Sequence, residues 1–353
     1  MREFYNYLKI LKSNQKSSGV IATVIEVIGS SYRHEGAKML FLQDGSQHGL
    51  ISGGCLEEDL KIQAEEVKTH QISKTITYDL QSEDDMGWGQ GAGCNGRITV
   101  LLEPFQWQSI FLEIMSELEN GHDVISIRGM TGEFAAVRLF ITMEGNWVDS
   151  SNLVDLSSME KYIREFKLNN QSVAIRYVDE YQSSFIMELF EAKEKLFIFG
   201  AGPDVEPIVR RAAEFDFLPV VIDPRESRCN AVNFPDAAWL VNEHPERFLD
   251  DNQVEVNSYV LIMTHSFTRD QQLVTYFSEN KPKYLGVLGP KRRTERLLFP
   301  KKVPEWFHSP IGVDIDAEGA EEISVSILAE LIQVRNRQRA LNKKRKRVKS
   351  EAV

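Results

Sequence analysis

Short apolar runs separated by turn residues fill the first hundred positions of the chain. They include VIATVIEVIG, KMLFLQ and RITVLLE, with a DGS turn after the second run. Runs of this length between turns are typical of strands, whereas LEEDLKIQAEEVK has the spacing of a helix. The pattern therefore predicts a mixed α+β domain over residues 1–105.

Residues 106–190 continue with a helical segment and more strands. FQWQSIFLEIMSELENG has helical spacing and ends at Gly121 after Asn120, and DVISIRGM, AAVRLFITM and WVDSS follow around an EGN turn. We find no catalytic or binding motif in this stretch. We expect it to be a connecting, β-rich extension of the first domain.

The pattern changes near residue 191 to strands that alternate with helices. KLFIFG, LPVVID, SYVLIMTH and KYLGVLG are apolar runs without polar alternation, and helical patterns such as TRDQQLVTYFSEN lie between them. Such runs are typical of parallel strands that are covered on both faces. The sequence predicts an α/β domain with a doubly wound parallel sheet over residues 191–342, followed by a basic tail at residues 343–353.

A glycine turn follows the first strand of this second domain. GAG at residues 200–202 precedes a helix, and Asp223 ends the next strand. In a Rossmann site, glycines admit a pyrophosphate to backbone amides and the acid binds a ribose. The chain departs at Val205, the third glycine position, and at Asp204, which we place in the first helical turn, where it would repel phosphate. We expect a Rossmann-like fold in which NAD(P) is a disfavoured ligand.

Ligands of doubly wound sheets bind beyond the carboxyl ends of the strands, and several strands here end near polar residues. His265 at such an end could donate a hydrogen bond or act as a base. Guanidinium groups nearby would offset Asp204 and accommodate an anion. The candidate crevice residues are Gly200, Gly202, Asp223, Arg225, His265, Gly289 and Arg292.

Composition and charge narrow the class of protein. The chain has 353 residues, 42% of them hydrophobic, and a net charge of −11, which argues against general nucleic-acid binding. Residues 335–349 hold nine Lys and Arg and no acid, which favours a solvated last helical turn with a disordered tail; docking onto an acidic partner is the alternative. Without an apolar span or a signal segment, we expect a soluble, cytoplasmic protein that does not bind membranes.

Three cysteines are too few for a disulfide framework, so each is expected to act as a thiol. Cys55 follows two glycines in ISGGCLEEDL, before a predicted helix whose N-terminus lowers a thiol pKa, although neighbouring acids oppose this. Cys94 lies in MGWGQGAGCNG, a loop that loses much backbone entropy on ordering. The glycine-rich turns around Cys55 and Cys94 favour sulfur chemistry or a soft metal over structural zinc. Cys229 has no such turn and is expected to be structural.

Eight motifs in order resemble the XdhC/CoxI family. GSSYRHEGAKMLFLQDG, ISGGCLEEDL and GAGCNGRITVLLEP carry the resemblance in the first domain. LFIFGAGPDVEP, VVIDPRES, IMTHSFTRD, YLGVLGPKRRTERL and PIGVDIDAEGAEEISVSILAELI extend it through the second. Residues 105–190 contribute least.

The resemblance implies an accessory protein of molybdenum hydroxylases such as xanthine dehydrogenase. Such proteins bind the molybdenum cofactor (molybdopterin) as cargo, hold it while a cysteine desulfurase supports its sulfuration, and insert it into the apo-enzyme. By this resemblance, Cys55 and Cys94 contact sulfur or molybdenum. The same resemblance places Ser52, Gly53, Gly54, Glu57 and Gly93 beside the cofactor, together with the crevice residues named above.

Two other functions stay open. The glycine turn and Asp223 are also compatible with an NAD(P)-binding oxidoreductase, and the basic tail with a stable, non-catalytic component of a xanthine dehydrogenase complex. Apolar faces on the first domain and a long C-terminal helix favour a homodimer. A cofactor chaperone, rather than an enzyme, is the function that we expect.

Overall fold

The computed structural model describes residues 3–13, 18–54, 56–80, 95–130, 132–149, 153–169, 171–252 and 254–350. The chain forms two compact units, Met1–Ala192 and Lys193–Val353, which we describe separately. None of the helices in these ranges is both long and apolar enough to cross a lipid bilayer.

Unit 1 contains two five-stranded antiparallel sheets, A and B. The first half of the unit, residues 3–106, contains sheet A and two helices. Its elements in chain order are α1 (Glu3–Ser13), β1 (Ser18–Ser30), β2 (Lys38–Leu42), β3 (Gln47–Gly49), α2 (Glu57–His70), β4 (Lys74–Asp79) and β5 (Asn95–Gln106). The second half, residues 110–190, contains sheet B and two helices. Its elements in chain order are α3 (Ile110–Glu119), β6 (Val124–Gly129), β7 (Arg138–Thr142), β8 (Trp147–Asp149), α4 (Leu156–Leu168), β9 (Val173–Val178) and β10 (Ser183–Phe190). Short 3₁₀ turns, Gly132–Ala136 and Asp179–Tyr181, interrupt the second half.

The two halves have the same topology. Sheet A has the strand order β3-β2-β1-β5-β4, and sheet B has β8-β7-β6-β10-β9, with one helix before the first strand and one after the third in each. The tight turns between the second and third strands also match. Leu42 N donates to Ser46 O at 3.0 Å, and Thr142 N donates to Asn146 O at 2.8 Å. Unit 1 is therefore an internal duplication, in which residues 106–190 form the second copy.

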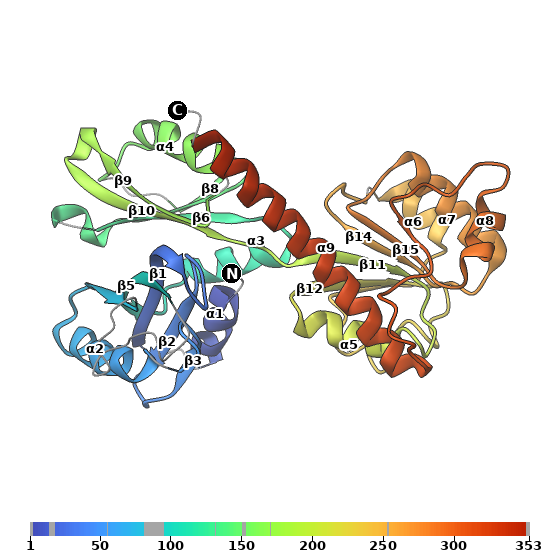
Figure 1. The fold of residues 1–353 in the computed structure, drawn as a ribbon, viewed down its shortest axis with the longest axis horizontal. Coiled ribbons are helices and arrows are strands. Elements are labelled where there is room, and N and C mark those ends of the chain that lie inside the picture. Colours follow the sequence, from blue (N-terminus) through green and yellow to red (C-terminus); the bar gives the residue numbers. More distant parts are fainter. Residues whose placement is uncertain are drawn as a thin grey trace. The chain divides into compact units, whose positions relative to one another are not determined.

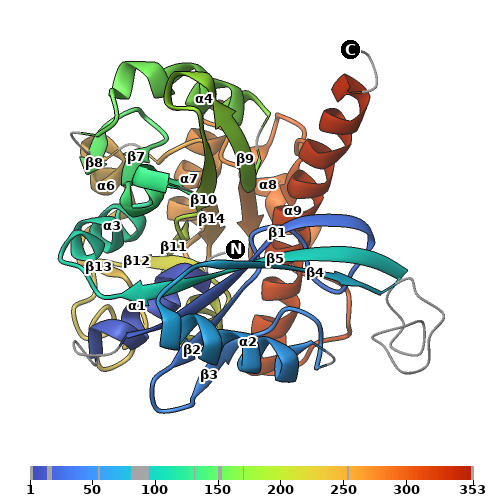
Figure 2. The same ribbon diagram turned by 90° about the vertical axis from the view of Figure 1, so that its left-hand side faces the viewer.

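Each sheet is covered on both faces. Helix α2 packs on the outer face of sheet A and α4 on the outer face of sheet B, and the inner faces meet each other, as Figure 2 shows. Helices α1 and α3 close one side of the inner layer with aromatic side chains, among them Phe4 and Phe111. Burial on two faces explains why β1 reads as a continuous apolar run.

Helix α4 was not foreseen from the sequence. Asp155 precedes it in extended conformation and accepts a hydrogen bond from Ser157 N at 3.1 Å, which is an ordinary N-cap. Met159, Ile163 and Phe166 then recur on one buried face. The cap and the spacing are both present in the sequence, but the two serines in the first turn have low helix propensity and weaken the helical pattern.

Unit 2 is the predicted doubly wound domain (Figure 1). Its strands are all parallel and follow the order β13-β12-β11-β14-β15-β16, which in the unit's own numbering is the Rossmann order 3-2-1-4-5-6. The elements are β11 (Glu194–Phe199), α5 (Glu206–Glu214), β12 (Phe217–Ile222), β13 (Trp239–Val241), α6 (Pro245–Asp251), β14 (Tyr259–Ile262), α7 (Phe267–Glu279), β15 (Tyr284–Val287), α8 (Lys291–Leu298), β16 (Phe307–His308) and α9 (Gly319–Ser350).

Two hydrophobic cores hold this sheet. Helices α5 and α9 bury apolar residues such as Val209 and Leu331 against one face. Helices α6, α7 and α8 cover the other, with Phe248, Phe277 and Leu297 among the buried side chains. The ends of the strands that lie between the two helix layers are thereby left to form the crevice.

The long C-terminal helix differs from the prediction of a disordered tail. Helix α9 continues through the basic segment to Ser350. Lysine and arginine are good helix formers, and positive charge near a helix C-terminus is favourable, so the segment extends the helix rather than ending it.

Candidate functional site

The loop before α2 is built around one carboxylate. Glu57 Oε1 accepts hydrogen bonds from Ile51 N at 3.0 Å and Ser52 N at 2.7 Å. Its Oε2 accepts from Gly54 N at 2.9 Å, from Leu56 N at 3.2 Å and from the Ser52 hydroxyl. Burial raises the pKa of Glu57, but these hydrogen bonds outweigh it and hold the pKa below its ordinary value. We name residues 51–57 the Glu57 loop.

The two glycines of the Glu57 loop give it its shape. Gly53 and Gly54 have φ angles of 83° and 119°, in a region that other residues rarely adopt. Both are exposed, and a Cβ on Gly54 would meet no atom within 4 Å. The amides of Ile51, Ser52, Gly54 and Leu56 turn inward to Glu57. The backbone of Gly54 faces open space, so an incoming ligand can approach it closely.

Several predicted site residues fall outside the part of the chain that the structure describes. These are Cys55, Gly93 and Cys94. Gly54 and Leu56, the neighbours of Cys55, are described, and both donate backbone hydrogen bonds to Glu57. Within the described ranges, no group of three or more His, Cys, Asp and Glu side chains is arranged to hold a metal ion. Cys229 is buried and burial raises its thiol pKa, which suits a structural role.

The predicted acid of the Rossmann crevice, Asp223, is already engaged. Its Oδ2 accepts from Ala201 N at 2.9 Å and from Arg225 Nη2 at 2.6 Å, and its Oδ1 accepts from Arg225 N at 2.9 Å and Nε at 2.8 Å. Burial raises the pKa of Asp223, but the bonds from Arg225 more than compensate and lower it. A ribose would have to displace Arg225 to use both oxygens of this carboxylate.

The glycine turn of the crevice is covered by a second acid. Gly200 has a φ of 121°, and a Cβ on Gly202 would collide with Asp204 Oδ1. Asp204 lies in the turn ahead of α5, which begins at Glu206, and not in the first helical turn as predicted. Its Oδ2 is 3.1 Å from His265 Nε2. The pair occupies the place beside the glycines at which a phosphate would bind, so Asp204 has to move for any anionic ligand.

The remaining predicted crevice residues lie at the end of β15. Gly289 has a φ of 108° and leads into α8, where Arg292 is exposed and has no hydrogen bond or ion pair to any residue that the structure describes. The next residue, Arg293, pairs with buried Asp270 at 2.7 Å. The sequence did not single out Asp270, which also accepts from the Thr264 hydroxyl and thereby fixes the end of β14.

Arg228 is a further crevice residue that the sequence did not indicate. Its Nε donates to Ala201 O at 2.9 Å, and its other end pairs with Glu206 at 2.5 Å. The predicted residues thus fall into two groups, the Glu57 loop in unit 1 and the crevice in unit 2. Gly200, Gly202, Asp223, Arg225 and His265 form one local network in the crevice.

Known proteins resemble both units. Residues 13–79 match the XdhC and CoxI family, and residues 196–331 match the XdhC Rossmann domain. A protein of Bacillus subtilis (strain 168) that is named as a probable xanthine dehydrogenase subunit is 35% identical over 342 residues, 96% of this chain and 99% of that protein. The "Molybdenum cofactor insertion chaperone PaoD" of Escherichia coli (strain K12) is 22% identical and aligns over 90% of this chain and 83% of its own length.

A solved structure leads to the same family. The crystal structure of a xanthine dehydrogenase from Bacillus halodurans superposes with a TM-score of 0.75 at 39% identity, and the match covers 94% of this chain and 95% of that one. The sequence resemblance is thereby confirmed over nearly the whole chain, including the middle segment that carries no motif. The chain belongs to the XdhC and CoxI family.

Proposed function

We propose that this protein is an accessory factor that binds the molybdenum cofactor and inserts it into the apo-form of a xanthine dehydrogenase-type hydroxylase. The observation that carries the proposal is the Glu57 loop, which lies in the segment that matches the family. The relatives support it, since one is named as a molybdenum cofactor insertion chaperone and another as a component of xanthine dehydrogenase.

The Glu57 loop suits a site that receives and releases cargo. Because Glu57 accepts hydrogen bonds from four backbone amides of the loop, these amides need no ligand to be satisfied. Cys55 lies between two residues anchored in this way and directly ahead of α2, whose N-terminus favours the thiolate. We propose that Cys55, with Cys94, supplies thiol contacts to the molybdenum or sulfur of the cofactor, a soft centre for which thiolates are suited.

The finer steps belong to the same proposal. A cysteine desulfurase would act on the cofactor while this protein holds it, and the cargo would then pass to the hydroxylase. The crevice of unit 2, with Arg225 and Arg292 as exposed cations, would accept an anionic group once Asp204 moves aside. We expect the protein to act in the cytoplasm as a homodimer.

Cysteine variants test the proposal directly. The protein is loaded anaerobically with molybdenum cofactor, and bound molybdenum and pterin are quantified by elemental mass spectrometry and pterin fluorescence. We expect Cys55→Ala and Cys94→Ala to lower the loading and the later activation of apo-hydroxylase at least tenfold. Cys229→Ala is the matched control because that thiol is buried in unit 2, and it should load normally. Full loading of the Cys55→Ala/Cys94→Ala double variant would refute the role of the thiols.

A second function is favoured by one specific observation. The Bacillus subtilis relative is named as a subunit, which suggests a permanent, non-catalytic component of a dehydrogenase complex. Co-expression with the hydroxylase distinguishes the two. A chaperone should leave the mature enzyme, whereas a permanent component should co-purify in stoichiometric amounts and stay bound at high salt.

A further inference from the structure

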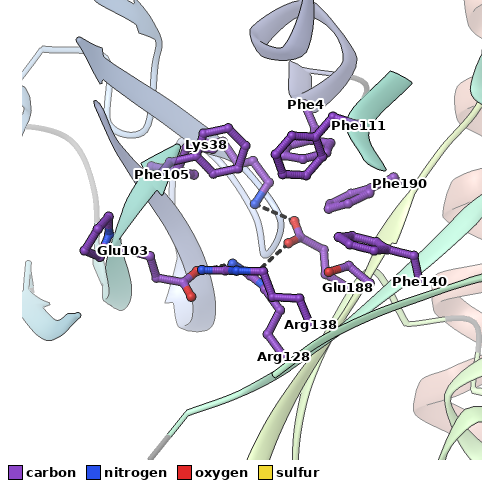
Figure 3. A pocket seen from close by; sticks show the side chains of 13 residues that line it. Phe4, Lys38, Glu103, Phe105, Phe111, Arg128, Arg138, Phe140, Glu188 and Phe190 are labelled. Carbon is purple, nitrogen blue, oxygen red and sulfur yellow. Dashed lines mark hydrogen bonds and ion pairs between the residues drawn. The ribbon is translucent and has the colours of Figure 1, made fainter. Parts of the chain in front are cut away.

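A cluster of charged side chains lies between the two sheets of unit 1. Lys38, Glu103, Arg128, Arg138 and Glu188 point toward one another there, with phenylalanine rings packed beside them (Figure 3). They line a cavity of about 20 Å³, which is room for one guest of the size of a water molecule. All five are buried except Arg138, which is half-buried.

The duplication relates these residues to one another. In the first half, the β1–β2 register pairs Thr23 with Lys38, and in the second half the β6–β7 register pairs Arg128 with Arg138. Lys38 and Arg138 each stand four residues before the matching tight turn, so they are counterparts, as are Thr23 and Arg128.

The glutamates are counterparts as well. Glu103 of β5 lies opposite Ile21 of β1, and Glu188 of β10 lies opposite Ser126 of β6. Lys38 Nζ of the first half is 2.6 Å from Glu188 Oε1 of the second. One cation and one carboxylate from each half would make two neutral pairs across the layer.

Strand β6 breaks this balance. Where the first half has Ile21 and Thr23, β6 carries Ser126 and Arg128. Arg128 bonds both Glu103 and Glu188 through its terminal nitrogens, so the cavity lining holds three cations and two carboxylates. Within the described residues, Ser126 Oγ and Arg128 Nε are both buried and have no hydrogen-bond partner. Ser126 and Arg128 are thus the two positions of β6 that differ in chemistry from their counterparts in β1, and both line the cavity.

Arg138 adds to the excess of donors. It lies directly across from Arg128 in the ladder, a like-charge pair that is unfavourable without compensation. Burial and then repulsion from Arg128 lower the pKa of Arg138. No residue in the described ranges makes a hydrogen bond or ion pair with its side chain. Guanidinium groups donate only, so the missing partner has to be an acceptor, and one positive charge is left to neutralise.

We propose that this cavity binds one halide ion, chloride under ordinary conditions, through Ser126 Oγ, Arg128 Nε and the guanidinium of Arg138. A monovalent ion cancels the single excess charge of the lining. The small volume excludes phosphate, sulfate and any part of a pterin, so the site is separate from the cargo site. Bound chloride would bridge β6 and β7 through these donors, all of which belong to sheet B, and would offset the repulsion between Arg128 and Arg138.

Halide substitution tests the proposal on the full chain. Thermal unfolding is followed while chloride replaces gluconate at constant ionic strength. We expect the stability of unit 1 to rise with the logarithm of chloride concentration above the dissociation constant, by about 1.4 kcal/mol per tenfold increase. A crystal grown in bromide should give an anomalous peak in the cavity.

Two variants and a control locate the effect. Arg138→Met should abolish the dependence on chloride, and the milder Ser126→Ala, which keeps the fold, should shift the halide midpoint at least tenfold upward. Arg164→Met is the control, because Arg164 is exposed on α4 and should respond like the wild type. Equal stability in chloride and gluconate, a chloride dependence that survives in Arg138→Met, or a cavity without a bromide peak would overturn the proposal.

Discussion

Replacing Glu57 with glutamine removes the acceptor that organises the Glu57 loop. A glutamine keeps one oxygen, which we expect to face the buried amides of Ile51 and Ser52, while its NH₂ group faces Gly54 N and Leu56 N. Leu56 N keeps its bond to the Ser52 hydroxyl at 2.8 Å, and water can solvate exposed Gly54. Losing the charge and the three contacts that Oε2 accepts should cost about 2 kcal/mol locally, at the lower end for charged hydrogen bonds because Glu57 is half-buried.

Hydrogen exchange measures this cost directly. A local loss of about 2 kcal/mol corresponds to roughly 30-fold faster exchange of the loop amides at pH 7. Glu58→Gln is the matched control, since Glu58 is the next residue, exposed and without a described partner. Because the pKa of Glu57 is lowered by folding, its contribution is present above pH 4.5 and is lost as the pH falls through the folded pKa. Exchange in Glu57→Gln that equals the control, or a difference from wild type that persists in strong acid, would refute this reasoning.

Three further results are expected. Asp155→Ala removes the cap of α4 and should lower the free energy of unfolding measured in urea titrations; an unchanged value would contradict the cap. Burial raises the pKa of Glu330, but hydrogen bonds with His308 and Tyr284 lower it overall, so Glu330 should stabilise unit 2 above pH 4.5 and lose this effect in acid. Glu330→Gln should reduce the loss of unfolding free energy at low pH. An unchanged pH dependence in the variant would show that Glu330 is not its cause. Calorimetry with NAD⁺ and NADP⁺ should show no binding heat, because Arg225 occupies the carboxylate of Asp223; saturable heat would revive the oxidoreductase alternative.

Much of the fold was predictable because burial leaves a strong pattern. The parallel strands of unit 2 are apolar throughout, and the order of strands and helices along the chain allows few arrangements. Helix α1 was missed although Phe4, Leu8 and Leu11 repeat on one face, because its tyrosines and asparagine blur the pattern. The duplication was invisible, since the halves share register and turns rather than recognisable sequence.

The glycine turns were easier to predict from the sequence than the hydrogen bonds around them. Gly53, Gly54 and Gly200 have positive φ angles, which other residues rarely adopt, so glycine clusters mark such turns in a sequence. The sequence could not show that the carboxylates of Glu57 and Asp223 satisfy the chain's own donors, as hydrogen-bond partners depend on side-chain directions that spacing does not fix. Asp270 and Arg228 were overlooked because neither belongs to a glycine turn.

The repeated topology of unit 1 makes it resemble a dimer fused into one chain. The inner face of sheet A is shaped to meet a sheet of the same design, so residues 1–106 alone would expose a surface suited to self-association. In such an isologous pair, Lys38 of each copy would face Glu103 of the other, and the charges would balance without an ion. We therefore expect this fragment to sediment as a homodimer, with its glycine loop displayed twice.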